Sequence, residues 1–321
     1  MTPRFLAIGD SFTEGVGDPN PRFPNGCRGW ADRVARQLAK QDPAWTYANL
    51  AVRSKRLRGI LDEQLEQGLA LRPTLTSLYA GGNDLLEWSA DVPALMEEYD
   101  DAVARIKAAG SEVLLFTGFD VSLSPLVAPM RRRNWEFNDA VREIAERRGA
   151  ILVDYWAFEE FAEPACWAED RLHMSTTGHR QLARRVLETL DVRHTIRPGG
   201  PGDELWDRPS SEGLDEASDI PRNTAEASRE ILRRAARLGR ALAEEEAWLR
   251  RWVGPMLVRR ARGITLGDEL EPKWPYPIRP AQGMKWNAKR RARVHVAPGT
   301  FLPPDLAPWA TGLRERGGQH V

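Results

Sequence analysis

The first 190 residues alternate short apolar runs with stretches of helical periodicity, and this alternation constrains the fold more than any other feature. Apolar residues at every third or fourth position line one face of a helix, as in Trp30, Val34 and Leu38. Strands that alternate with helices pair mostly in parallel. The sequence therefore predicts an α/β fold, a three-layer α/β/α sandwich around a mostly parallel five-stranded sheet. The expected strands are Phe5–Ile8, Thr46–Val52, Thr74–Ala80, Glu112–Gly118 and Ala150–Asp154.

The chain divides into segments of different composition, with a first domain expected over 1–196. Residues 197–223 are rich in Pro, Gly, Ser and Asp and lack apolar periodicity, which indicates a linker. Helical periodicity in 224–271 predicts a helical extension. Residues 272–321 contain many prolines and the basic segment KWNAKRRARVHV at 285–296, and we expect an irregular Pro-rich basic tail there.

The composition argues against several classes of protein. Apolar residues make up 42% of the chain, yet no stretch approaches the roughly 18 apolar residues of a membrane span. The N-terminus MTPRFLAIGD lacks the features of a secretory signal, so a cytoplasmic location is expected. The 46 basic and 46 acidic side chains cancel, so no nucleic-acid partner is expected. Two cysteines, Cys27 and Cys166, form neither a disulfide framework nor a zinc motif. The oligomeric state stays open.

Polar residues follow the expected strands where those strands end. Ligands of open α/β sheets bind at the carboxyl ends of the strands, so these residues are the candidates for a site. They are Gly9–Ser11 after the first strand, Arg53–Lys55 after the second, Gly81–Asp84 after the third, and Asp170–His173 at the end of the connection after the fifth.

This set contains the parts of a serine hydrolase. A serine hydroxyl needs a base, a group that orients the base, and donors for the oxyanion. Ser11 is the candidate nucleophile, His173 the base and Asp170 the orienting carboxylate, since a spacing of three lets Asp170 reach Nδ1 while Nε2 faces Ser11. The backbone N–H of Ser11 and the amide of Asn83 are candidate oxyanion donors, and Gly82 lets the backbone approach a substrate.

Three motifs carry a resemblance to a known family. GDSFTEG near the N-terminus, GGND after the third strand and DRLHMSTTGH near residue 173 resemble blocks I, III and V of the GDSL/SGNH hydrolase family, over roughly residues 4–190. The resemblance implies a flavodoxin-like fold and a serine ester hydrolase that acts through an acyl-Ser11 intermediate with neither metal nor organic cofactor. Residues 248–275 are similar to the C-terminal extension of actinobacterial members.

The resemblance also assigns a further oxyanion donor, with one departure. The family has an Asn after the second strand and, five residues later, a Gly whose backbone N–H joins the oxyanion hole. Here the matching stretch NLAVRS runs from Asn49 to Ser54, so Ser54 stands in the place of glycine. A β-carbon there is disfavoured where φ is positive.

Alternative interpretations remain for several residues. Ser11 alone is equally typical of a helix cap, His179 is a competing base, Asp154 a competing acid and Cys27 a competing nucleophile. The run Arg131–Arg133 is either a solvated helix start or a steering element for an anionic substrate.

Two classes of function stay open at this point. The substrate of an esterase is a small-molecule or lipid acyl ester, or an acetyl group on a carbohydrate or small molecule that the same triad removes. The alternative is a non-catalytic scaffold whose basic tail binds a polyanion.

Overall fold

The computed structural model describes residues 2–87, 89–119, 128–197, 243–244, 246–262 and 265–284. The chain forms two compact units, Met1–Pro198 with Leu266–Val321, and Gly199–Thr265. The described part of the second unit includes the π-helical turn η8 (Leu249–Val253) and helix α10 (Gly254–Ala261). Nearly all of the expected linker at 197–223 lies outside the described residues.

The first unit is built on one sheet with the strand order β5-β4-β3-β1-β2-β6. Its strands are β1 (Arg4–Gly9), β2 (Thr46–Asn49), β3 (Leu75–Tyr79), β4 (Glu112–Phe116), β5 (Ile151–Val153) and β6 (Trp274–Ile278). The first five pair in parallel, and β6 lies antiparallel to β2 at the edge. The predicted α/β fold with its mostly parallel sheet is confirmed. The predicted count of five strands is wrong, because residues placed in an irregular tail supply a sixth.

The sixth strand was not predicted from the sequence because of its prolines. Proline lacks a backbone N–H, so a stretch such as WPYPI does not suggest a strand. In the structure Trp274 pairs with Asn49 and Ile278 with Tyr47, and the prolines occupy positions between them. Their missing donors are tolerated because β6 is an edge strand, and a proline-bearing edge also discourages pairing with other chains.

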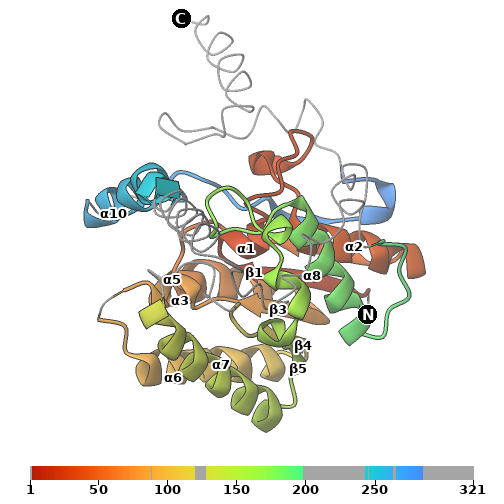
Figure 1. Ribbon diagram of the computed structural model, residues 1–321. Coiled ribbons are helices and arrows are strands. Elements are labelled where there is room, and N and C mark those ends of the chain that lie inside the picture. The colour runs from red at the N-terminus through yellow and green to blue at the C-terminus, as the bar shows by residue number, and fades with distance from the viewer. Residues whose placement is uncertain are drawn as a thin grey trace, which may run out of the picture. The chain divides into compact units, whose positions relative to one another are not determined.

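Helices cover both faces of the sheet (Figure 1). Helices α2 (Gly29–Gln41) and α8 (Thr176–Thr189) pack on one face. The other face carries α3 (Leu57–Ile60), η2 (Leu61–Leu65), α4 (Glu66–Ala70), α6 (Val92–Ala108) and α7 (Ala128–Arg148). Short elements are α1 (Ser11–Glu14), α5 (Gly82–Leu85), η1 (Pro24–Gly26), η4 (Tyr155–Ala157), η5 (Glu159–Ala162), η6 (Pro164–Cys166) and η9 (Pro280–Gln282). Among the described helices, none has the length and apolar character needed to cross a membrane.

The packing of β6 predicts unequal effects for two of its aromatic residues. Trp274 is 2% exposed and its Nε1 donates to Asp32 at 3.1 Å, whereas Tyr276 is 75% exposed. Trp274→Ala should lower the free energy of unfolding by about 3–5 kcal/mol, since it leaves a large cavity. The control Tyr276→Ala should stay within about 0.5 kcal/mol of the wild type. Urea unfolding of the full chain measures both, and equal effects would contradict the assignment of β6 to the core sheet.

Candidate active site

The turn after β1 places Ser11 at the start of helix α1. Gly9 has φ +152°, and a β-carbon on it would lie 2.4 Å from the carbonyl oxygen of Tyr79, so only glycine fits. Asp10 is the N-cap of α1, since its Oδ1 accepts the N–H of Phe12 at 3.1 Å. The capping role therefore falls to Asp10, and the hydroxyl of Ser11 is left for another partner.

The loop before α8 brings a histidine to that hydroxyl. Asp170 Oδ1 accepts the backbone N–H groups of Leu172 (3.0 Å) and His173 (2.9 Å), which closes a tight turn. The other carboxylate oxygen, Oδ2, accepts from His173 Nδ1 at 2.6 Å. Nε2 of the same ring lies 3.0 Å from Ser11 Oγ. Because the carboxylate only accepts, Nδ1 carries the hydrogen and Nε2 is the acceptor for the serine hydroxyl.

The electrostatics of this hydrogen-bonded chain favour a proton acceptor. Burial alone would lower the pKa of His173, but the charge and hydrogen bond of Asp170 outweigh it and raise this pKa above its ordinary value. Burial alone would raise the pKa of Asp170, but His173 and two backbone N–H groups lower it. Asp170 is therefore ionised near neutral pH, and His173 binds a proton more tightly than a free imidazole does.

Two of the predicted oxyanion donors, Ser54 and Asn83, lie in neighbouring segments, the loop after β2 and helix α5. Ser54 follows β2 with φ +66°, the left-handed region that favours glycine. Asn83 in α5 donates from Nδ2 to Asp10 Oδ2 (3.0 Å) and to the carbonyl of Lys55 (3.1 Å). Both Nδ2 hydrogens thus have acceptors in the unliganded protein, so an oxyanion would share one of them. Asn83 also ties the Ser54 loop to the turn that carries Ser11.

The two glycines before Asn83 differ in their packing. Gly81 has φ +103°, and a β-carbon there would lie 2.5 Å from the ring of Phe137, so this position requires glycine. A β-carbon on Gly82 would meet nothing within 4 Å. Packing does not demand glycine at position 82, and its contact with a substrate stays a prediction.

The competing candidates make other contacts. His179 is buried in α8, where its Nε2 donates to the carbonyl of Val16 at 3.0 Å and burial lowers its pKa to about 4. Asp154 accepts two hydrogen bonds from Arg142 at 3.0 Å. The Cys27 thiol is buried, and burial raises its pKa to about 12. None of these contacts involves the hydroxyl of Ser11.

The run of three arginines also has partners outside the site. Arg131 lies over the ring of Trp156, and Arg132 pairs with Glu136 at 2.9 Å. The guanidinium of Arg133 donates to the carbonyl of Glu87 at 2.7 Å.

Sequence reasoning missed the residues that hold these loops in place. The side-chain amide of Gln64 in η2 accepts a hydrogen bond from the Gly9 N–H at Oε1 and donates one from Nε2 to the Gly9 carbonyl, both at 2.9 Å. Glu14 is fully buried at the end of α1. Its carboxylate accepts three hydrogen bonds from Arg53, from the backbone N–H (2.7 Å), Nε (2.9 Å) and Nη2 (2.7 Å). Lys273 is fully buried nearby. The burial of these charged side chains would have identified them, but burial can be recognised only once the fold is known.

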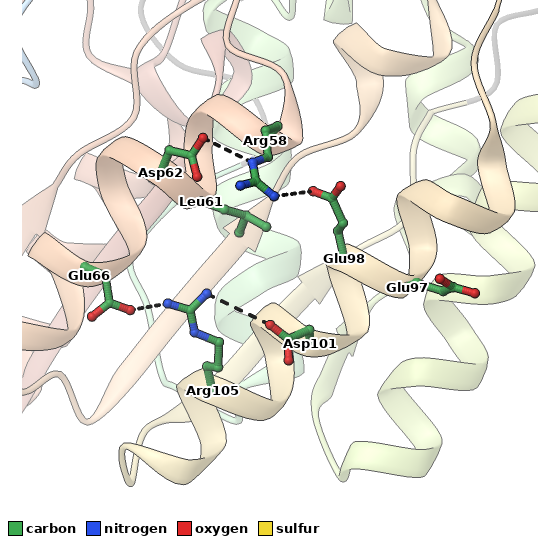
Figure 2. A pocket seen from close by; sticks show the side chains of 8 residues that line it. All are labelled: Arg58, Leu61, Asp62, Glu66, Glu97, Glu98, Asp101 and Arg105. Atoms are coloured by element: carbon green, nitrogen blue, oxygen red, sulfur yellow. Dashed lines mark hydrogen bonds and ion pairs between the residues drawn. The ribbon is translucent and has the colours of Figure 1, made fainter.

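The groove in Figure 2 lies away from these residues, between the α3–η2–α4 stretch and α6. Arg58 pairs with Asp62 and Glu98, and Arg105 pairs with Glu66 and Asp101. The Arg58–Glu98 and Arg105–Glu66 pairs link the α3–η2–α4 stretch to α6 on the outside of one sheet face. No residue of the predicted site lines the groove.

Comparison with known proteins places the chain in a family. A sequence model of the GDSL-like lipase/acylhydrolase family matches residues 7–181. The chain belongs to this family. An acetylxylan esterase of Geobacillus stearothermophilus is 28% identical over an alignment of 206 residues, and the match covers 58% of this chain and 93% of that protein. The family and this relative show that the protein is a carboxylic ester hydrolase.

Solved structures agree with the family assignment. The crystal structure of Axe2, an acetylxylan esterase from Geobacillus stearothermophilus, matches with a TM-score of 0.52 and 26% identity, over 60% of this chain and 97% of that one. LAE5, an α/β hydrolase from the metagenome of Lake Arreo, is 22% identical with a TM-score of 0.52 over 60% of this chain and 97% of its own, which shows the fold alone. Within the described part of this hydrolase, no group of three or more His, Cys, Asp or Glu side chains is arranged to hold a metal ion.

The backbone of Ser54 predicts a stabilising substitution. A β-carbon in the left-handed region costs about 1–2 kcal/mol. Replacing it with glycine removes this strain, but the greater conformational entropy of glycine in the unfolded chain offsets part of the gain. Ser54→Gly should therefore raise the free energy of unfolding by about 0.5–1 kcal/mol. Ser54→Ala, which keeps the β-carbon, is the control and should not be stabilised. Urea unfolding measures both, and a destabilised Ser54→Gly would contradict the strain assigned to this residue.

The raised pKa of His173 predicts the pH dependence of hydrolysis. The base must be neutral, so kcat/KM should rise with pH through a midpoint above the ordinary histidine value of about 6.5. Asp170→Asn should move this midpoint to lower pH and reduce the rate roughly 10⁴-fold. An unmoved midpoint would contradict the role of Asp170. Burial raises the pKa of Asp10 to about 7, so the limb must persist in Asp10→Asn for its assignment to His173 to hold.

Proposed function

We propose that this protein removes acetyl groups from a carbohydrate ester, through a covalent acetyl intermediate on Ser11. The observation that carries the proposal is the hydrogen-bonded chain from Ser11 Oγ to His173 Nε2 at 3.0 Å and from His173 Nδ1 to Asp170 at 2.6 Å. This arrangement gives the serine hydroxyl a base, and gives the base a fixed tautomer.

In the acylation step, Ser11 Oγ attacks the ester carbonyl carbon while His173 Nε2 takes the hydroxyl proton. The negative charge that develops on the carbonyl oxygen is stabilised by the backbone N–H groups of Ser11 and Ser54 and by Nδ2 of Asn83. The resulting imidazolium faces the carboxylate of Asp170, which stabilises its charge. His173 then gives the proton to the leaving alcohol as the bond between the carbonyl carbon and the alcohol oxygen breaks.

Deacylation repeats these steps with water as the nucleophile. His173 takes a proton from water, the hydroxyl attacks the acetyl carbon, and the same donors hold the second oxyanion. Return of the proton to Ser11 Oγ releases acetate. His173 is 24% exposed at its side chain, so water reaches the ring without any opening of the fold.

The acetyl group and the carbohydrate alcohol are supported by the relatives. The match to the acetylxylan esterase covers 93% of that protein, and Axe2 is matched over 97% of its chain. Lipid esters are disfavoured by this likeness. Hydrolysis rates of p-nitrophenyl esters with acyl groups of increasing length, from acetyl to octanoyl, distinguish an acetyl esterase from an esterase of lipid esters.

The other class of function gains no support. The basic segment at 285–296, on which polyanion binding rests, lies outside the described residues. The cytoplasmic location stays a prediction from the N-terminal sequence.

The nucleophile has a direct test. Ser11→Ala should lower kcat for p-nitrophenyl acetate and for acetylated xylo-oligosaccharides by roughly 10⁴-fold or more, because the triad acts as a unit. Ser175→Ala is a suitable control, since that serine caps α8 and touches none of the triad side chains in the described hydrogen bonds. Acetate release and ester cleavage are followed at neutral pH, and near wild-type turnover in Ser11→Ala would rule out the mechanism.

A further inference from the structure

The chain returns to the first unit at Leu266, and the returning segment packs beside the active-site loops. We call residues 266–284 the C-terminal strap. It supplies β6 and the buried residues Lys273 and Trp274. The fold alone does not require a lysine there, since an edge strand is held by its ladder and its apolar contacts.

Lys273 is fully buried and its ammonium group is completely satisfied. Nζ donates to the carbonyl oxygens of Glu14 and Arg28, each at 2.7 Å, and to Asp32 Oδ2 at 2.5 Å. Three hydrogens thus meet three acceptors. Burying an ammonium ion costs several kcal/mol unless its partners are well placed, so this geometry demands that the three acceptors stay in position.

One of these acceptors belongs to the nucleophile helix. Glu14 is the last residue of α1, and Ser11 is the first. The Glu14 carbonyl binds Lys273, and its carboxylate binds the backbone and guanidinium of Arg53. A continuous series of contacts therefore runs from the strap through α1 to the residue that precedes Ser54.

A second contact of the strap reaches the same loop independently. A β-carbon on Gly267 would lie 2.1 Å from the carbonyl oxygen of Arg53 and 2.9 Å from the side chain of Val52. The strap backbone thus lies directly against the residue that precedes Ser54. Farther along, the Glu271 carbonyl accepts from Asn25 Nδ2 at 3.1 Å, and the same amide nitrogen donates to Glu14 at 3.0 Å.

We propose that the C-terminal strap is part of the active-site framework, and that Lys273 and Gly267 are positioning residues that hold the Arg53–Ser54 backbone as an oxyanion donor beside Ser11. The proposal rests on the proposed function. Ser54 occupies a backbone region unfavourable for a residue with a β-carbon, so the surrounding structure must hold it there. A donor displaced by about 1 Å loses roughly 10²-fold in rate, and the strap supplies that restraint.

Gly267→Ala tests the proposal without removing a buried charge. Its methyl group must displace the Arg53 carbonyl, so kcat for p-nitrophenyl acetate should fall at least about 10-fold, with KM changed by less than about twofold. The acidic limb of the pH profile should stay in place, because the hydrogen bonds of His173 and Asp170 do not pass through the strap. The matched control is Gly59→Ala in α3, whose β-carbon would make only an ordinary contact of 3.6 Å, and it should keep wild-type kcat.

Lys273→Met tests the positioning lysine itself. The methionine keeps the length of the side chain but leaves the Glu14 and Arg28 carbonyls without their donor, so both stability and kcat should fall. Rates are compared at a temperature where circular dichroism shows each variant folded, and Gly267→Ala supports the conclusion if Lys273→Met does not fold.

The outcomes separate the two proposals. An active wild type with wild-type kcat in folded Gly267→Ala overturns the role of the strap and leaves the proposed function intact. A wild type that neither cleaves acetyl esters nor reacts with a fluorophosphonate at Ser11 overturns the proposed function. Loss of kcat in Gly267→Ala alongside an unaffected Gly59→Ala supports the strap as part of the site.

Discussion

The geometry of the candidate site depends on the contacts of one buried glutamate, Glu14, at the end of helix α1. Burial alone would raise the pKa of Glu14, but Arg53 and Lys273 outweigh it and hold this pKa below its ordinary value, so the carboxylate is charged. Its carboxylate fixes the loop after β2, and its carbonyl binds the ammonium of Lys273. Because a buried charge without a partner is costly, these elements must be placed together or not at all. The contacts of Glu14 with Arg53 and Lys273 thus hold the two segments that carry Ser11 and Ser54.

The sequence predicted the parts of the site that are encoded locally. A spacing of three residues was enough to bring Asp170 to His173, and the turn after the first strand was enough to place Ser11 at the start of α1. The strand-end rule then gathered these residues at one edge of the sheet. The supporting residues were beyond reach, because Gln64 lies 55 positions from Gly9 and Lys273 lies 259 positions from Glu14. Nothing in the local pattern distinguishes a buried polar side chain from an exposed one.

The sixth strand shows why propensity fails at an edge. Alternating prolines remove the donors that a strand ordinarily needs, yet Trp274 and Ile278 still pair with β2 because only one side of an edge strand is paired. Composition described the segment correctly as rich in proline. The tertiary context, an unpaired edge of β2 and a buried pocket for Trp274, decided its conformation.

The late return of the chain has a consequence for biosynthesis. Residues up to 197 hold Ser11, Asp170 and His173, but Asp32 and the outer edge of β2 meet their partners only when residues 273–278 have left the ribosome. Contacts so far apart in sequence form late, since a long loop must close first. A nascent chain therefore carries all three residues of the proposed triad well before its framework is complete, and a product truncated before the strap contains these three residues without those that support them.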